Sequence, residues 1–205
     1  MSELLGVFGG TFSPPHLGHR HAVDVFLQQV RPDRLLIIPT YLPPHKTESD
    51  GATPTDRLEM CRLAFGDLPK TEISDIEIRR TGKSYTSDTL RELTREDRRI
   101  AFLIGTDMML SLDTWHEPET LFRLCKMYCI RREEDAETAA QIQEKNAEYL
   151  RRFGQSVTML PAPAVTLSST DVRRRLASLG GSADISPAVM AYIREKGLYC
   201  NDRYT

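Results

Sequence analysis

The sequence lacks any strong excess of charge and any long apolar run. Its 27 Lys and Arg nearly balance its 29 Asp and Glu, giving a formal net charge of -2 at pH 7. A basic excess, the usual footprint of a nucleic-acid or anionic-membrane partner, is therefore missing. No apolar stretch approaches membrane-spanning length, and residues 1–5 lack the basic region of a signal peptide. We therefore expect a cytoplasmic protein that binds neither nucleic acid nor membrane.

Cysteine is also scarce. The chain has four, at Cys61, Cys125, Cys129 and Cys200. Cys125 and Cys129 have a helical spacing, but no second pair of Cys or His accompanies them, so small buried hydrophobes are favoured over a zinc site. The sequence assigns no metal ligand to the protein.

What the chain does contain is a regular alternation of strand-like and helix-like segments. Amphipathic stretches follow His19, begin at Thr53-Pro54 and run from Ser87 to about Arg95. The short apolar runs between them predict strands at Leu4–Phe8, Leu35–Ile38, Ile76–Ile78, Ile100–Ile104 and Met127–Ile130. This alternation indicates right-handed βαβ units.

The expected fold is therefore α/β: a Rossmann-like, doubly wound, mostly parallel sheet with helices on both faces. With 205 residues and 40% hydrophobic content, a single domain spanning 1–205 is the default. A small helical portion is expected at about 169–205. A charged stretch, 131–156, is expected to hold a solvated helix on the outside of the sheet.

The most informative segment follows the first predicted strand. It reads Gly-Gly-Thr-Phe-Ser-Pro-Pro-His-Leu-Gly-His at residues 9–19. The glycines let a phosphate approach the backbone, and the following helix offers unpaired N–H groups and the positive end of its dipole. Ligands of such sheets bind at the carboxyl ends of strands, where this segment begins. A nucleotide phosphate site is predicted here.

His16 and His19 stand three residues apart, on one turn of the expected helix. They could be metal ligands, donors to phosphate oxygens, or merely helix caps. No third metal ligand lies nearby, and no His-Glu-x-x-His pattern occurs. Capping explains neither the glycine pair nor the two prolines of the turn. The pattern therefore favours donors to phosphate.

Two further segments could handle anions. Lys46, in Pro43-Pro44-His45-Lys46, could reach leaving-group phosphates as a point charge or be an ordinary exposed loop lysine. Residues 82–90 read as a loop entering a helix, whose N-terminus could be capped by its own hydroxyls or hold a carboxylate or phosphate.

Three more candidates lie later in the chain. Asp107, after the strand Ile100–Ile104, could accept hydrogen bonds from ribose hydroxyls or cap a helix. Trp115, the only tryptophan, is flanked by polar residues and could stack on an aromatic ligand or belong to the core. The segment 166–173 predicts a capped helix start that could also bind an anion through its hydroxyls and Arg173.

Together these segments resemble the nucleotidylyltransferase superfamily, and within it the bacterial nicotinate mononucleotide adenylyltransferases. The resemblance rests on residues 9–19, 43–46, 84–90, 105–107 with Trp115 downstream, 168–173 and 192–199. The His-x-Gly-His element marks the superfamily, and Ser-Tyr-Thr, Gly-x-Asp and Trp in this order mark the subfamily. The chain departs from the pattern at Ser13, where many members carry Asp, and at Pro15, where a branched aliphatic residue is usual.

The resemblance implies transfer of the adenylyl group of ATP to the 5′-phosphate of nicotinate mononucleotide, giving nicotinate adenine dinucleotide and pyrophosphate on the route to NAD. In-line attack needs no protein nucleophile, and Mg²⁺ is expected to arrive on the ATP phosphates. The implied partners are ATP and nicotinate mononucleotide, with self-association left open. The implied catalytic residues are His16, His19 and Lys46.

The resemblance also implies two sets of binding residues. ATP would contact Gly9, Gly10, Thr11, Phe12, Gly18, Gly105, Asp107, Ser168, Ser169, Thr170 and Arg173. Nicotinate mononucleotide would contact Thr11, Lys46, Tyr85, Thr86, Asp107, Trp115 and Arg131. Trp115 would stack on the pyridine, and backbone N–H groups around Tyr85 and Thr86 would receive the carboxylate.

Two alternatives stay open. One is a transferase of the same fold with nicotinamide mononucleotide or pantetheine phosphate as acceptor, although a flexible pantetheine arm offers Trp115 nothing flat to stack on. The other is a catalytically silent nucleotide-binding protein, against which the presence of His16, His19, Lys46 and Arg173 argues.

Overall fold

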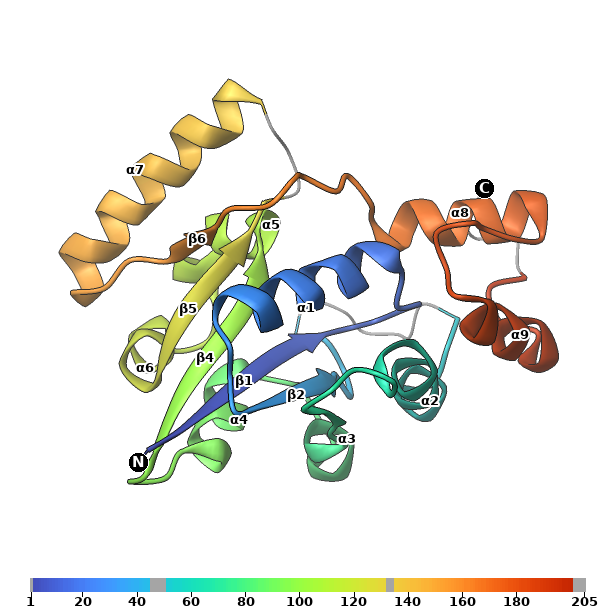
Figure 1. Ribbon diagram of the computed structural model, residues 1–205, viewed down its shortest axis with the longest axis horizontal. Helices are drawn as coiled ribbons and strands as arrows, with labels where there is room; N and C mark the ends of the chain where they lie inside the picture. The colour runs from blue at the N-terminus through green and yellow to red at the C-terminus, as the bar shows by residue number, and fades with distance from the viewer. Residues whose placement is uncertain (1, 45–50, 132–134, 201–205) are drawn as a thin grey trace.

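The computed structural model describes residues 2–44, 51–131 and 135–200. Within these ranges six parallel strands form one sheet in the order β3-β2-β1-β4-β5-β6 (Figure 1). The strands are β1 (Glu3–Gly10), β2 (Arg34–Pro39), β3 (Thr71–Ile73), β4 (Arg98–Gly105), β5 (Cys125–Ile130) and β6 (Thr158–Leu160). The chain builds outward from β1 to β3 and then returns to β4, so the strand order reverses between β1 and β4. The predicted Rossmann-like fold is confirmed.

Side chains of the central strands alternate between the two faces of the sheet, as a period of two requires. In β2, Leu35 and Ile37 belong to one buried cluster, while Leu36 belongs to the other. Both faces are therefore apolar, which is why these strands read as continuous hydrophobic runs in the sequence.

Helices cover both faces. The face that carries Leu35 and Ile37 is packed by α1 (Leu17–Gln29) and α2 (Pro54–Phe65). The opposite face is packed by α3 (Ile76–Arg80), α4 (Thr86–Leu93), α5 (Thr106–Leu110), the short 3-10 helix Leu112–Thr114, α6 (Pro118–Leu124) and α7 (Ala136–Phe153). The helix expected at Thr53-Pro54 is α2, with Thr53 as its N-cap in a reciprocal capping box with Asp56.

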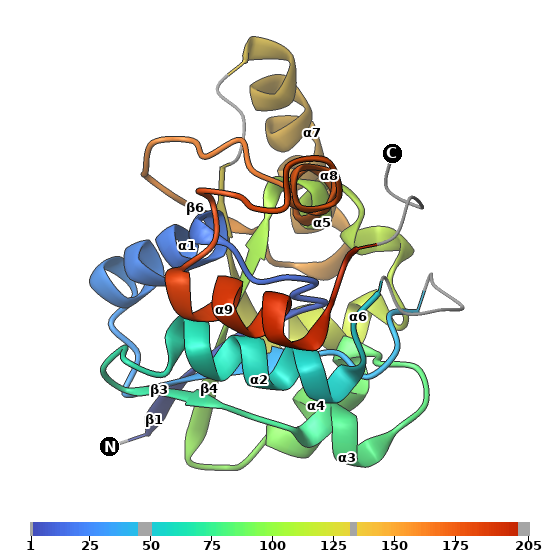
Figure 2. The same ribbon diagram turned by 90° about the vertical axis from the view of Figure 1, so that its right-hand side faces the viewer.

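The end of the chain forms a small helical layer of α8 (Ser169–Leu179) and α9 (Pro187–Lys196). In Figure 2, α9 lies against α2, and Met60 of α2 shares a buried cluster with Val172 and Val189. This packing brings the C-terminal helices to the same end of the sheet as the N-terminus of α1 (Figure 1). No helix in the described ranges is long and apolar enough to cross a membrane.

One predicted strand is wrong. Ile76–Ile78 lies in helix α3, and the strand that pairs with β2 is the shorter Thr71–Ile73 just before it. The two isoleucines flank Glu77, and the alternation suggested a strand. In the structure Glu77 is buried and accepts a hydrogen bond from the Thr89 hydroxyl at 2.6 Å, so tertiary contacts override the local β preference.

The edge strand β6 and the four cysteines can also be compared with the sequence predictions. The edge strand β6 was not predicted, because three residues are too few to show a period. Cys125 and Cys129 are buried free thiols, as expected; Cys61 is buried as well, whereas Cys200 is exposed. Burial raises the pKa of Cys125 to about 12, so this thiol stays protonated and behaves as a small hydrophobe.

Candidate active site

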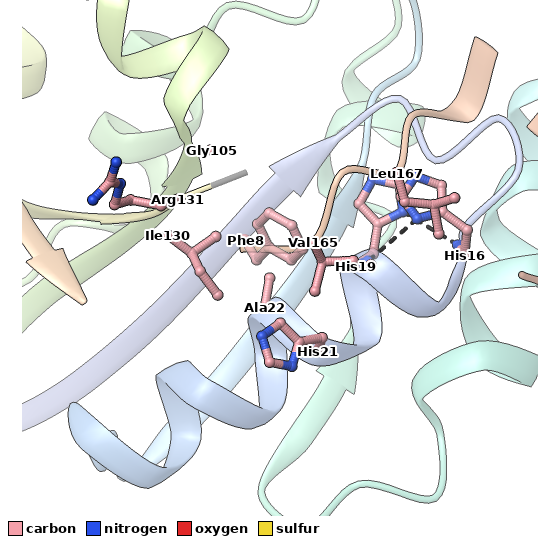
Figure 3. Close-up of a pocket in the computed structure, with 11 residues that line it drawn as sticks. Phe8, His16, His19, His21, Ala22, Gly105, Ile130, Arg131, Val165 and Leu167 are labelled. Carbon is pink, nitrogen blue, oxygen red and sulfur yellow. Dashed lines mark hydrogen bonds between the residues drawn. The ribbon is translucent and has the colours of Figure 1, made fainter. Parts of the chain in front are cut away.

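A cleft opens at the carboxyl edge of the sheet, beside the N-terminus of α1 (Figure 3). It holds about 380 Å³ when its open mouth is counted. Its lining residues come from the ends of β1, β4 and β5, from α1, and from the segment before α8: Phe8, His16, Gly18, His19, His21, Ala22, Gly105, Ile130, Arg131, Val165 and Leu167. The opening motif and Gly105 thus meet where the strand order reverses, which is where ligands bind in this class of fold.

His16 and His19 form the start of α1. His16 is the N-cap, and its Nδ1 accepts the backbone N–H of His19 at 3.4 Å. The Nδ1 of His19 accepts the backbone N–H of His16 at 3.2 Å, which completes a reciprocal capping box. Because each Nδ1 accepts a hydrogen bond, the proton of each neutral imidazole lies on Nε2. Each ring is therefore a donor through Nε2.

The turn before α1 is fixed by aromatic packing. Phe12 has a left-handed backbone (φ 49°) and is only 2% exposed. Its ring packs against Phe8, His19 and Phe65 at centroid distances of 5.4, 5.1 and 5.9 Å. Phe12, predicted to contact ATP, thus has its side chain in the core, which leaves only its backbone for a ligand.

Gly18 lies where a side chain would disturb the histidine pair. A Cβ at this position would come within 3.1 Å of the His16 ring and 3.3 Å of the Leu167 side chain. Both distances are shorter than ordinary van der Waals contacts. A side chain here would push the His16 ring or Leu167 aside by a few tenths of an ångström, so packing in the protein itself favours the glycine of His-x-Gly-His.

The start of α8 is brought to the same loop. Arg173 is buried and donates to the carbonyl of Ser13 at 2.7 Å, and the hydroxyl of Ser169 lies 3.2 Å from the carbonyl of Pro14. Ser168 caps α8, and the hydroxyl of Thr170 accepts from Arg173 at 3.2 Å. The residues at the start of α8 that were predicted to bind ATP are thus adjacent to the motif of residues 9–19. The hydrogen bonds of Ser169 and Arg173 hold the backbone of Pro14 and Ser13.

Ser13, the departure from the family pattern, is 1% exposed. Its hydroxyl lies 3.1 Å from the phenol of Tyr199, near the end of the chain. A hydroxyl paired with this phenol is a neutral, hydrogen-bonded group, so its burial carries no cost of desolvating a charge.

The residues expected at the acceptor end also converge. Tyr85 is the N-cap of α4 and Thr86 its first residue. The ring of Tyr85 lies 4.2 Å from that of His116, inclined by 33°. Trp115 is partly buried and packs on the large core cluster beside α6. His116 was not singled out from the sequence, although its place between Trp115 and Glu117 in a polar segment was a usable signal.

The other predicted residues lie around the carboxyl edge. Gly9 and Gly10 end β1, and Gly105 is the N-cap of α5, with Asp107 exposed in the first turn. Arg131 lines the cleft, but its guanidinium points away from the histidine rings (Figure 3), and its buried Nε has no hydrogen-bond partner among the residues that the structure describes. Lys46 lies outside the described residues.

The chain resembles proteins of one named activity. Residues 7–175 match the cytidylyltransferase-like family. A protein named probable nicotinate-nucleotide adenylyltransferase from Synechococcus sp. (strain JA-3-3Ab) is 40% identical over 199 residues, covering 95% of this chain and 94% of that protein. One with the same name from Dehalococcoides mccartyi (strain CBDB1) is 35% identical over 204 residues, 98% of each chain. The chain belongs to the nicotinate-nucleotide adenylyltransferase family.

The fold agrees with this assignment. The structure of Plasmodium falciparum nicotinic acid mononucleotide adenylyltransferase complexed with NaAD superposes with a TM-score of 0.73 at 19% identity, covering 96% of this chain and 97% of that one. Membership makes the chain a nucleotidyltransferase, as the sequence motifs predicted.

Arg57 on α2 is a buried residue that touches the adenylyltransferase motif and was not predicted from the sequence. Its side chain donates to the carbonyl of Thr11 at 2.8 Å and to the carbonyl of Tyr41 at 2.9 Å. A signal existed: Arg57 is three and four residues before Met60 and Cys61, so a charged residue lies on the buried stripe of an amphipathic helix. Buried arginines of this kind are rare without dedicated partners.

Proposed function

We propose that the protein transfers the adenylyl group of ATP to the 5′-phosphate of nicotinate mononucleotide in one in-line step. The observation that carries this proposal is the pair of Nε2 donors, His16 and His19, at the N-terminus of α1 in a cleft at the point of strand-order reversal. The acceptor phosphate attacks the α-phosphorus, the new P–O bond forms as the bond to pyrophosphate breaks, and no covalent enzyme intermediate arises.

The histidine pair suits this chemistry because both reactants are anions. Negative charge builds on the α-phosphoryl and leaving oxygens, and preorganised donors stabilise it. The N-terminus of α1 adds the positive end of a 13-residue helix that has no acidic residue in its first turn. Lys46, Ser168 to Thr170 at the start of α8, and Arg173 would steady the triphosphate, and Asp107 would hold ribose hydroxyls.

The acceptor end suits a flat, carboxylated base. The N-cap Tyr85 makes no side-chain hydrogen bond to the first turn of α4, so backbone N–H groups there are not satisfied by the cap. Such groups hold a carboxylate well. Trp115 would stack on the pyridine ring, and the Tyr85–His116 pair would stand beside it.

Magnesium fits this site as a companion of ATP. The described residues contain no group of three His, Cys, Asp or Glu side chains that could hold a metal, and those of them that line the cleft include no carboxylate. Mg²⁺ commonly keeps several waters and binds through substrate phosphates. When bound, it neutralises charge on the triphosphate, while the protein supplies the hydrogen-bond donors.

The test is a pyrophosphate-release assay with ATP, Mg²⁺ and a panel of acceptors: nicotinate mononucleotide, nicotinamide mononucleotide and phosphopantetheine. We expect the highest kcat/KM with nicotinate mononucleotide, because an amide presents no charge to the N-terminus of α4. Equal or better turnover of either rival acceptor would contradict the acceptor proposed here. Absence of pyrophosphate with every acceptor would favour a silent nucleotide-binding protein.

A further inference from the structure

Arg57 of α2 forms hydrogen bonds to two separate loops of the candidate active site. Arg57 is only 2% exposed. Its guanidinium donates through Nη1 to the carbonyl of Thr11 at 2.8 Å. Through Nη2 it donates to the carbonyl of Tyr41 at 2.9 Å, and Nη1 lies 3.4 Å from the hydroxyl of Thr40. Thr11 belongs to the motif turn, whereas Thr40 and Tyr41 follow β2.

The connection continues to the acceptor side. The backbone N–H of Tyr41 donates to the hydroxyl of Ser84 at 2.8 Å, and the N–H of Ser84 donates to the carbonyl of Leu42 at 2.9 Å. Ser84 is buried and directly precedes Tyr85, the N-cap of α4. An unbroken series of hydrogen bonds therefore runs from Thr11 through Arg57 and Tyr41 to the loop that begins α4.

We propose that Arg57 is a positioning residue that fixes the ATP-binding turn relative to the acceptor-binding loop. The inference rests on the proposed function, because it assigns these two loops to the two substrates. An in-line transfer needs the acceptor oxygen and the α-phosphorus within a few tenths of an ångström of their reacting geometry, and a rigid link between the two loops supplies that alignment.

The side-chain chemistry explains why this position is arginine. A guanidinium presents several donors in a fixed plane and can reach two carbonyls in different directions at once, whereas an ammonium is a compact point charge. The two carbonyls also gain charge-assisted hydrogen bonds, which are stronger than neutral ones. Lysine at this position would keep the charge but lose the two-pronged connection.

The test compares Arg57→Lys with the unmodified protein. We expect kcat for pyrophosphate release to fall by about 30-fold, while the Kd of ATP and that of nicotinate mononucleotide, each measured alone by calorimetry, change by less than about fivefold. Hydrogen exchange of peptides covering 9–13 and 40–44 should accelerate by about tenfold. A kcat within about threefold of the unmodified value would overturn the proposal.

Arg98→Lys is the matched control. Arg98 also has a guanidinium side chain that is only 5% exposed; it donates to a backbone carbonyl, that of Leu93 at 2.9 Å, and pairs with Glu3. It lies at the amino ends of β1 and β4, away from the cleft. This variant should lose stability yet keep kcat. If it loses kcat as much as Arg57→Lys does, a general effect of buried arginines replaces the positioning role.

Two further measurements keep the result decisive. If Arg57→Lys does not fold, Ser84→Ala removes the acceptor of the Tyr41 N–H, and an unchanged kcat in that variant contradicts the connection. If the unmodified protein releases no pyrophosphate, the proposed function fails. The exchange rates of the two loops in Arg57→Lys then still decide whether Arg57 holds them, since unchanged rates refute the link.

Discussion

The imidazole rings of His16 and His19 lie nearly parallel, with centroids 3.7 Å apart and planes inclined by 26°. Each ring also accepts the backbone N–H of the other residue through Nδ1. The pair therefore has two separable tasks: the Nδ1 atoms cap α1, and the Nε2 atoms carry the N–H donors that the proposed reaction uses. Variants can be chosen that remove one task and leave the other.

His16→Ser separates the two tasks. Serine is a strong N-cap, so the N-terminus of α1 stays capped, and only the loss of the buried ring stacked on His19 should lower the thermal midpoint, by about 5 °C. The Nε2 donor is lost, so kcat for pyrophosphate release should fall by about 100-fold. The check is a calorimetric melt beside a turnover assay, and undiminished turnover would remove His16 from the proposed mechanism.

Gly9→Ala and Gly18→Ala should behave differently. At Gly9 the nearest heavy atoms to an added Cβ are 3.9 Å away, so the substitution strains nothing in the protein. We expect an unchanged thermal midpoint but a KM for ATP raised about tenfold, because a phosphate must come close to this backbone.

At Gly18 the added Cβ meets the His16 ring at 3.1 Å, so both stability and kcat should decline. Melting curves and initial rates on the two variants distinguish these outcomes. An unchanged KM for ATP in Gly9→Ala would argue against close approach of a phosphate at that glycine.

Trp115→Ala should affect one substrate only. Loss of a stacking surface costs about 1–2 kcal/mol, which corresponds to a rise of about 5- to 30-fold in the KM for nicotinate mononucleotide. The KM for ATP should change little, and Trp115→Phe should recover most of the loss. Steady-state kinetics with each substrate varied in turn provide the measurement. Equal effects on both substrates would show that Trp115 acts through the core it packs against.

Glu77→Gln should show a pH-dependent gain in stability. Burial raises the pKa of the Glu77 carboxyl above its ordinary 4.5, and hydrogen bonds from Thr89 and Ser84 with the charge of Arg80 offset this only in part. The folded protein therefore holds this proton more tightly than the unfolded chain. Its stabilising contribution is complete below 4.5 and is lost as the pH rises through the elevated folded-state pKa.

Glutamine has no proton to lose. The difference in unfolding free energy, Glu77→Gln minus unmodified, should therefore grow as the pH rises above 4.5. Urea unfolding at a series of pH values measures it. A constant difference across that range would mean that Glu77 has the same pKa in the folded and unfolded states.

Much of the architecture could be predicted from the sequence. Four strands are buried on both faces and therefore appear in the sequence as apolar runs: β1, β2, β4 and β5. The N-cap Thr53 and the following proline predicted the start of α2. Ile76–Ile78 misled because a local alternation cannot show that Glu77 finds a buried partner in Thr89, 12 residues later.

The candidate site divides in the same way. Residues 9–19 predicted a phosphate site from one continuous segment, because the glycines, the turn and the helix N-terminus that bind a phosphate are all local features of the sequence. The sequence by itself determined the fold class, the family and the two histidines of the motif. Only the tertiary structure decided that each Nδ1 accepts the backbone N–H of the other histidine and that the ring of Tyr85 lies beside that of His116. It also decided that residues of α8 bind the carbonyls of Ser13 and Pro14, and that Arg57 joins Thr11 to Tyr41. These contacts join residues far apart in the chain or depend on side-chain direction, so no local pattern records them.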